Sequence, residues 1–279
     1  MADQKHLDAH YTRMDKIFRL SLGEKGAYSC ARFDGDFSMT TEAAQLKKYQ
    51  FIIDNCNIKK GSKVLDMGCG WGGLALWMAE KYGCKVTGVN LAEGQVKYAN
   101  QHIKNPNVEI IHMDYRDVPK LQRKFDKVIS IGMMEHVGYK NHRVLMETVK
   151  KVLKPDGLFL LHHCAHDKSI TTSNPWITKY IFPGAVIPSL VQIAKAAEGV
   201  FIMEDWHNIG SHYDPTLMAW HKNFEGAWPQ FKDQYSEKFY RMFRYYLLIC
   251  AGAFRARDIE LWQMVFSTKG IVGGYESVR

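Results

Sequence analysis

The sequence lacks long apolar runs. None of its 279 residues belongs to a run of the roughly 18 apolar residues that a membrane-spanning helix needs. The most apolar stretch, residues 245–254, is too short to cross a bilayer. Residues 1–20 contain Asp3, Asp8 and Asp15 but no apolar block, so no secretory signal peptide is expected. These absences predict a cytoplasmic protein without a transmembrane segment.

Cysteine pairs and linkers are also missing. The six cysteines form no CxxC pair and are scattered, at positions 30, 56, 69, 84, 164 and 250. This spacing favours reduced thiols over disulfides or a zinc site, so no metal is predicted. No repeat, low-complexity segment or Pro/Gly/Ser-rich linker divides the chain. We therefore expect a single domain over residues 1–279.

Acidic residues are outnumbered by basic ones. The chain has 37 Lys and Arg against 29 Asp and Glu, which gives a net charge of +8. A basic surface attracts an anionic partner such as nucleic acid or an acidic membrane. A solvated surface without a specific partner would have the same composition, so charge alone does not decide.

Short apolar runs alternate with helical stretches in the first part of the chain. The runs that predict strands lie at 63–67, 85–90, 108–112, 126–131 and 158–164. The helical stretches between them lie at 74–82, 93–104 and 139–153. A turn, KPDG at 154–157, is expected to end the last of these helices. Strands alternating with helices indicate parallel βαβ units and an α/β fold of Rossmann-like type.

The flanking regions complete the predicted fold. An amphipathic helix is expected over 3–22, and a second helix over 41–56 with Thr40 or Thr41 as its cap. After residue 165 the pattern predicts a helix at 189–197, an extended run at 200–206, helices across 214–256 and a last strand at 259–268. The sheet would be mostly parallel and seven-stranded, with helices on both faces. We divide the chain into an N-terminal helical segment, a cofactor-binding core, an insertion that covers the substrate, and a last strand with its tail, at 1–56, 57–164, 165–256 and 257–279.

The first predicted strand runs into a glycine-rich turn over residues 66–73, DMGCGWGG. Glycines let the backbone approach a ligand and point amide N–H groups at it. Both dinucleotide and S-adenosylmethionine sites use such a turn. Asp66 suits the cationic sulfonium and ammonium of S-adenosylmethionine and would repel a pyrophosphate. We therefore predict S-adenosylmethionine, bound at Asp66, Gly68 and Gly70.

Polar residues follow the next two strands. Asn90 ends the second strand, where an acidic residue commonly binds the ribose hydroxyls, and Gln95 follows one turn later. Their amides can make the same hydrogen bonds. Asp114 and Tyr115 follow the third strand, where a carboxylate could accept from the adenine amino group and a ring could cover the adenine. Asp114 could instead be a helix cap.

The turn that marks base-modifying methyltransferases is absent. These enzymes carry N/D-P-P-Y/F after the fourth strand, whereas this chain has MMEH at 133–136. The sequence NPWI at 174–177 comes one strand too late. This absence counts against methylation of nucleic-acid amino groups, so no nucleic acid partner is predicted.

Six longer motifs resemble one family closely. They are AYSCARF (27–33), VLDMGCGWGGLALWMA (64–79), IGMMEHVG (131–138), FLLHH (159–163), DPTLMAWHKNF (214–224) and CAGAFRARDIELWQMVF (250–266). The set is similar to cyclopropane-fatty-acyl-phospholipid synthases, including the shorter mycolic acid cyclopropane synthases, over about residues 5–270. The resemblance implies a class I methyltransferase that transfers a methyl group from S-adenosylmethionine to the cis double bond of an acyl chain.

The resemblance also implies a bound bicarbonate ion as the base that removes a proton to close the ring. Its ligands would be the main chain of Cys30, Glu135, His162, the main chain of Cys164 and the hydroxyl of Tyr213. Tyr28 and Ser29 would lie at the cofactor, and an aromatic face could stabilise the cationic intermediate. We expect Glu135 to position the base rather than act as the base. His136 is expected to be structural.

The chain departs from the family pattern at several points. Arg32 stands where an aromatic residue is common, Met134 where Phe is common, and His163 and Cys164 where Thr and an aliphatic residue are common. The changes at Arg32 and Met134 could reshape the acyl site. Phospholipid-acting members usually carry an extra N-terminal domain, whereas this chain begins almost directly at the catalytic region.

The predicted partners are an unsaturated acyl substrate and, transiently, the anionic inner face of the membrane. The basic and aromatic segments 238–241 and 244–246 suit such docking. A homodimer is a weaker expectation. Two other readings stay open: an N-methyltransferase of a small amine, in which Glu135 would bind the amine without bicarbonate, and a non-catalytic module that binds a lipid surface.

Overall fold

The computed structural model describes residues 17–18, 20–23, 26–230 and 232–279. Its centre is one seven-stranded sheet in the order β3-β2-β1-β4-β5-β7-β6. The strands are β1 (Lys63–Met67), β2 (Lys85–Asn90), β3 (Val108–His112), β4 (Phe125–Ile131), β5 (Leu153–Ala165), β6 (Ile202–Asn208) and β7 (Glu260–Ser267). The expected mostly parallel, seven-stranded sheet is confirmed.

The central strands are parallel because each is joined to the next through a helix or a helical segment. β1 pairs with β2 on one side and with β4 on the other, both in parallel. β7 is antiparallel to β5 and to β6, so it alone among the seven strands of this sheet runs in the opposite sense, and the edge strand β6 runs in the same sense as β5. β1, with four of its five residues buried, reads as an apolar run because both faces of the sheet are covered.

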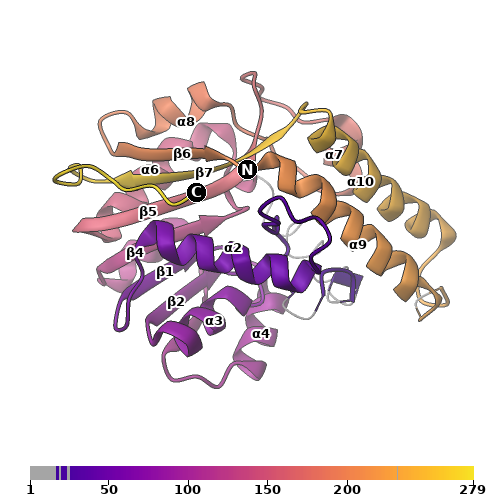
Figure 1. The fold of residues 1–279 in the computed structure, drawn as a ribbon, viewed down its shortest axis with the longest axis horizontal. Coiled ribbons are helices and arrows are strands. Elements are labelled where there is room, and N and C mark those ends of the chain that lie inside the picture. The colour runs from indigo at the N-terminus through magenta and orange to yellow at the C-terminus, as the bar shows by residue number, and fades with distance from the viewer. Residues whose placement is uncertain (1–16, 19, 24–25, 231) are drawn as a thin grey trace.

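Helices cover both faces of the sheet (Figure 1). They are α2 (Thr41–Cys56), α3 (Gly73–Tyr82), α4 (Glu93–His102), α5 (Met134–Val137), α6 (His142–Val152), α7 (Pro175–Tyr180), α8 (Leu190–Ala197), α9 (Tyr213–Ala227) and α10 (Glu237–Arg255). Four short 3-10 segments are η1 (Tyr115–Leu121), η2 (Tyr139–Asn141), η3 (Gly210–His212) and η4 (Trp228–Gln230).

Three apolar clusters organise these elements. One lies between the sheet and α6 and α8, and a second between the sheet and α2, α3 and α4. The third is rich in aromatic side chains and joins α9 and α10 to Cys30, Trp71 and Leu261. In Figure 1 the paired helices α9 and α10 stand beside one end of the sheet. We call this third cluster the aromatic cluster because of its aromatic rings; Cys30 belongs to it, and Cys164 and Tyr213 pack against it.

The structure differs from the sequence prediction in the boundaries of some elements and in one additional helix. β5 begins at Leu153 and runs through the KPDG segment, which was expected to be a turn, with a register shift against β4 near Phe125. α7 was not expected at all; Asn174 caps it and a proline follows at its first position. The region expected to be helical over 214–256 is divided into α9 and α10. Most of the N-terminal helix expected over 3–22 lies outside the described residues.

No helix among the described residues is long and apolar enough to cross a bilayer.

Candidate active site

A cavity lies at the carboxyl ends of the central strands. There β1 pairs with β2 on one side and with β4 on the other, so the chain's connections leave in opposite directions and open a crevice. The segment 26–29 and the loops that follow β1, β2 and β4 supply most of the wall. Eight of the nine residues predicted to bind the cofactor line it: Tyr28, Ser29, Asp66, Gly68, Gly70, Asn90, Gln95 and Tyr115.

The glycine-rich turn after β1 forms the floor of this cavity. Gly68 has φ of +82°, and a Cβ atom there would lie 3.2 Å from Cβ of Met133. Its N–H donates to the carbonyl of Val89 at 2.8 Å, which ties the turn to β2. Gly72 has φ of +80° and caps α3 without a side-chain hydrogen bond. The turn therefore requires glycine for its shape, and it leaves the N-terminus of α3 beside the cavity.

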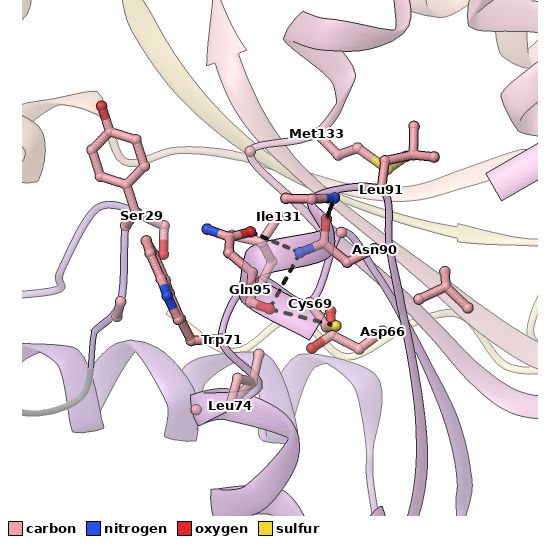
Figure 2. Close-up of a pocket in the computed structure, with 18 of the residues that line it drawn as sticks. Ser29, Asp66, Cys69, Trp71, Leu74, Asn90, Leu91, Gln95, Ile131 and Met133 are labelled. Atoms are coloured by element: carbon pink, nitrogen blue, oxygen red, sulfur yellow. Dashed lines mark hydrogen bonds between the residues drawn. The ribbon is translucent and has the colours of Figure 1, made fainter. Parts of the chain in front are cut away.

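Asn90 and Gln95 form one amide network with this turn (Figure 2). The Asn90 side-chain amide donates to the Gly70 carbonyl at 3.2 Å and to Oε1 of Gln95 at 2.7 Å. The N–H of Ala92 donates in turn to Oδ1 of Asn90 at 3.3 Å. The network fixes both amides at the cavity wall, where they can bind vicinal hydroxyls.

Asp114 is the one predicted cofactor residue that does not line the cavity. Its carboxylate accepts from the N–H of Arg116 at 2.8 Å and caps η1, which is the alternative that the sequence left open. The guanidinium of Arg116 also donates to both carboxylate oxygens, at 2.8 and 2.6 Å. A role of Asp114 toward adenine stays a prediction.

Lys48 is a cavity residue that sequence reasoning missed. It lies on α2, is 2% exposed and donates from Nζ to Oγ of Ser29 at 2.8 Å. Burial lowers its pKa to about 7, although the nearby Cys30 and Asp66 oppose the shift. Burial also raises the pKa of the Asp66 carboxyl to about 7, and Lys48 opposes that shift. Lys48 and Asp66 are therefore buried ionisable groups beside the glycine turn, and each favours the charged form of the other.

Helix α2 holds the segment that carries Ser29 and Cys30. Besides the Lys48 contact, the side-chain amide of Gln45 donates to the Ser29 carbonyl at 2.8 Å. The N–H of Ala31 donates to Oγ1 of Thr216 on α9 at 3.1 Å. The segment thus runs from the cofactor cavity to the aromatic cluster, and it is fixed by helices on both sides.

Glu135 and Cys164 meet at the edge of the aromatic cluster. Glu135 lies on α5 directly after β4, and the main-chain N–H of Cys164 on β5 donates to its Oε1 at 2.6 Å. Its other oxygen, Oε2, is buried and has no hydrogen bond within the described part of the chain. Burial raises the pKa of the carboxyl. Oε1 therefore fixes the position of the Glu135 side chain, and Oε2 can accept a hydrogen bond from a ligand.

Two further predicted residues present unpaired polar groups. Both ring nitrogens of His162 are buried without a hydrogen bond to a described residue. Burial, with Lys48 and His163 adding to it and the Gln263 side chain opposing it, lowers the pKa of His162 to about 3, so the ring is neutral near pH 7. Among the described residues no hydrogen bond uses the main chain of Cys30, although its thiol lies 3.2 Å from the Ala31 carbonyl. Such groups are costly to bury unless a ligand satisfies them.

Tyr213 closes the site from α9. Burial raises the pKa of its phenol, and the neighbouring Cys164, Cys30, Tyr28 and Glu135 raise it further. The structure therefore brings Cys30, Glu135, Cys164 and Tyr213 close together, and their role as ligands of a base stays a prediction.

Aromatic rings surround this polar group. Tyr213 packs on Phe254 with ring centroids 4.5 Å apart and lies edge-on to Trp220 at 6.0 Å. The hydroxyls of Tyr28 and Tyr246 are 2.7 Å apart, which joins the cofactor wall to α10. Aromatic faces therefore lie beside the polar groups of Tyr213 and Tyr28.

The departures at Arg32 and Met134 fall outside this group. Met134 is fully buried in the cluster between the sheet and α6, and an effect on the acyl site stays a prediction. The Arg32 guanidinium stacks over the ring of Phe51 on α2 at 3.7 Å and pairs with Asp34. His136 lines the cofactor cavity and lies edge-on to Phe182 at 5.4 Å, and its Nδ1 has no partner within the described chain.

Comparison with known proteins places this geometry in a family. The model of the mycolic acid cyclopropane synthetase family matches residues 1–264. The cyclopropane-fatty-acyl-phospholipid synthase of Escherichia coli (strain K12) is 47% identical over 271 residues, covering 97% of this chain and 69% of that protein.

Two solved structures agree with these matches. The cyclopropane synthase MmaA2 from Mycobacterium tuberculosis has a TM-score of 0.86 and 26% identity, and it covers 94% of this chain and 97% of its own. Mycolic acid cyclopropane synthase CmaA1, complexed with SAH and CTAB, has the same TM-score and coverage at 28% identity. The chain therefore belongs to the mycolic acid cyclopropane synthetase family and is an S-adenosylmethionine-dependent methyltransferase of the cyclopropane-fatty-acyl-phospholipid synthase type.

Proposed function

We propose that the enzyme methylates the cis double bond of an unsaturated phospholipid acyl chain and closes a cyclopropane ring with the help of bicarbonate. The observation that carries this proposal is the set of buried polar atoms, at three of the predicted catalytic residues, that have no hydrogen bond within the described part of the chain. It comprises Oε2 of Glu135, both ring nitrogens of His162 and the main chain of Cys30. A small oxyanion can satisfy several such groups at once, whereas an acyl chain can satisfy none.

The cofactor cavity fits S-adenosylmethionine. The amides of Asn90 and Gln95 would bind the ribose hydroxyls, and Tyr115 would cover the adenine. The Asp66 carboxylate lies where it would stabilise a cationic group, and the N–H groups at the start of α3 suit a carboxylate. When bound, S-adenosylmethionine supplies an electrophilic methyl group.

The chain's own residues would have to stabilise a cationic intermediate and to exclude water from it. The π electrons of the double bond form the new bond to the methyl carbon, which leaves a cation on the other alkene carbon. The faces of Tyr213 and Trp220 would stabilise that cation, and the closed aromatic cluster excludes water that would trap it. Loss of one proton from the new methyl group then lets its C–H electron pair close the ring.

The acceptor of that proton would be bicarbonate, which becomes carbonic acid. Because Cys164 fixes Oε1 of Glu135, Oε2 is free to accept the O–H of bicarbonate and to direct the ion's other oxygens at the substrate. Tyr213 and the Cys30 N–H would donate to those oxygens, and so would His162 from whichever nitrogen carries its proton. Glu135 therefore positions the base. Because α9 and α10 supply Tyr213 and Tyr246, we also propose that region 165–256 covers the substrate.

Expression in cells tests the activity directly. The host should contain cis-unsaturated phospholipids and lack its own cyclopropane synthase. We expect fatty acid methyl esters heavier by one CH2 unit, measured by mass spectrometry. A folded chain that binds S-adenosylmethionine and yields no such product would contradict the proposal.

Glu135→Gln tests the role of the carboxylate. The amide can still accept from Cys164, but it loses the second carboxylate oxygen, so kcat should fall by about 100-fold or more. Affinity for S-adenosylmethionine should not change, because Glu135 does not line the cofactor cavity. Glu147→Gln on the exposed face of α6 is the control, since Glu147 only pairs with Arg143. If wild-type kcat is the same in bicarbonate-depleted buffer, bicarbonate is not the base.

A further inference from the structure

A groove lies along α10 beside α7, on the side of the molecule where α9 and α10 stand (Figure 1). We call it the α7–α10 groove. Basic and aromatic side chains dominate its lining, which consists of Trp176, Tyr180, Glu237, Lys238, Tyr240, Arg241, Met242, Arg244, Tyr245 and Leu248. Helix α7 continues the pattern with exposed Lys179, whose Nζ lies 5.2 Å from the ring centroid of Tyr180.

The cations of the groove are available to an anion. Lys238 and Arg241 are exposed and form no ion pair with a described residue. Arg244 is shared with Glu225, 3.3 Å away, and Glu237 is the one acidic residue in the lining. The local charge is therefore positive, and it is concentrated on successive turns of one helix.

Exposed aromatic rings accompany these cations. Tyr245 is 49% exposed and lies edge-on to Trp176 with ring centroids 4.7 Å apart, and Tyr180 is 36% exposed. Ile249, one turn beyond Tyr245, is 37% exposed. Amphipathic rings next to Lys and Arg are typical of surfaces that lie at the boundary between lipid headgroups and acyl chains.

The groove and the aromatic cluster share the same helix. The inward face of α10 contributes Phe243 and Tyr246, both buried in the cluster that contains Cys30. Met242 and Tyr240 line the groove and also pack against that cluster, and so does Trp176 of α7. A lipid whose phosphate lay at the cations would therefore have apolar side chains continuing from its headgroup toward the reacting groups.

We propose that the α7–α10 groove docks the enzyme on an anionic phospholipid bilayer and takes a lipid headgroup phosphate between Lys238 and Arg241. This inference rests on the proposed function, because it names the surface through which that site meets its lipid. Charge complementarity and the adjoining aromatic cluster favour a bilayer over an acidic protein, whose recognition would not require apolar side chains leading inward.

Vesicle partitioning of the full chain tests the proposal, with a second basic groove as control. Lys63 and Lys85 are exposed in a groove at the amino ends of β1 and β2, away from the cofactor cavity. Lys238→Glu/Arg241→Glu and Lys63→Glu/Lys85→Glu change the net charge equally. Binding would be measured by co-sedimentation with phosphatidylglycerol–phosphatidylcholine vesicles and with phosphatidylcholine vesicles.

We expect wild type and the Lys63/Lys85 variant to prefer the anionic vesicles, and that preference to weaken with salt. The Lys238/Arg241 variant should bind them at least about 30-fold more weakly, since each lost cation near an anionic surface contributes a factor of about five and the two new carboxylates add repulsion. Unchanged affinity for S-adenosylmethionine would show that this variant is folded. Equal losses in both variants would overturn the proposal, because they would mean that only net charge matters.

Activity separates this inference from the proposed function. On unsaturated phospholipid dispersed in a neutral detergent, the Lys238/Arg241 variant should keep the wild-type kcat but show a raised KM, because the headgroup phosphate loses its cations, while on anionic vesicles its activity should fall with its binding. The two proposals can also fail separately. If the Lys238/Arg241 variant loses vesicle binding but wild type forms no cyclopropane product, the proposed function is contradicted and the docking surface is still supported. Vesicle binding unaffected by Lys238→Glu/Arg241→Glu, with capture of acidic polypeptides lost instead, would refute bilayer docking.

Discussion

At the scale of single residues, Lys48 interacts both with Ser29, in the segment that leads to Cys30, and with Asp66 at the glycine-rich turn. Its ammonium bonds to Ser29 and opposes the effect of burial on Asp66. Lys48→Met would leave the Asp66 carboxyl buried without its cation, and the pKa of that carboxyl would rise further. We expect affinity for S-adenosylmethionine to fall about tenfold at pH 7, and to recover partly at higher pH as Asp66 ionises. Calorimetric titration at the two pH values would measure both effects.

The neighbouring lysine provides the control for this prediction. Lys47 is exposed on the same helix and pairs with Asp34 at 3.3 Å, so Lys47→Met should not affect cofactor binding. S-adenosylhomocysteine lacks the sulfonium charge, and its affinity should fall less than that of S-adenosylmethionine in Lys48→Met. Equal losses for the two ligands would mean that Lys48 acts only through the position of Ser29.

Single-residue prediction reached the cavity where a motif indicated the chemistry, and the binding roles of these residues stay predictions. The glycine turn, Asn90 and Gln95 were placed in the cofactor cavity from the sequence alone, and the structure puts them there. Lys48 was missed because lysine on a helix is most often solvated. Its spacing held a signal, since Ala44, Lys48 and Ile52 recur every four residues along the buried stripe of α2.

At the scale of elements, helix α3 begins and ends at glycines with left-handed backbone. Gly72 has φ of +80° before its first residue, and Gly83 has φ of +61° after its last. Alanine at either position should cost about 1–2 kcal/mol of unfolding free energy. Only Gly72→Ala should also weaken cofactor binding, because its Cβ would lie 2.6 Å from Ile103 and push on the turn that forms the cavity floor.

Urea unfolding and cofactor titration of both variants check this difference. Gly83→Ala is a matched control, since its Cβ would meet only Lys60, at 3.4 Å, and Gly83 does not line the cavity. The prediction is wrong if both variants lose stability and cofactor affinity to the same degree.

Helices and strands were predicted most accurately where the periodic pattern of apolar residues was strongest. Helices such as α2 were placed within a residue, because several turns of spacing define them. α7 has only six residues, too few for a period, although Asn174 before Pro175 is a capping signal. KPDG has the composition of a turn, yet β5 runs through it because Leu153 before it and Leu158 after it both pair with β4, and that tertiary information is not local.

At the scale of the whole molecule, the active site gathers segments that are distant in the sequence. Glu135, Cys164 and Tyr213 lie on α5, β5 and α9, and Cys30 precedes all of the strands. The βαβ alternation predicts that residues after neighbouring strands share one edge of the sheet, and this brings Glu135 near Cys164. Nothing local predicts that α9 returns over that edge. The prediction that Tyr213 of α9 belongs to the site therefore came from the family resemblance.

Histidine burial gives the whole molecule a pH-dependent stability. His142 on α6 and His162 and His163 on β5 are buried, and burial lowers their pKa values to about 4, 3 and 4. In the unfolded chain each titrates near 6.5. As the pH falls from about 6.5 to 4, the unfolded state therefore gains protons that the folded state does not. Each histidine lowers the unfolding free energy by up to about 1.4 kcal/mol per pH unit.

His142→Leu isolates one of these protons. Both ring nitrogens of His142 are buried without a partner among the described residues, so leucine removes a titrating group and no hydrogen bond. Asp66, whose pKa burial raises to about 7, opposes the trend in wild type and variant alike and cancels in the comparison. Urea unfolding between pH 7 and 5 should show a pH slope smaller by up to about 1.4 kcal/mol per unit in His142→Leu. Identical slopes would mean that the folded protein protonates His142 as readily as the unfolded chain does.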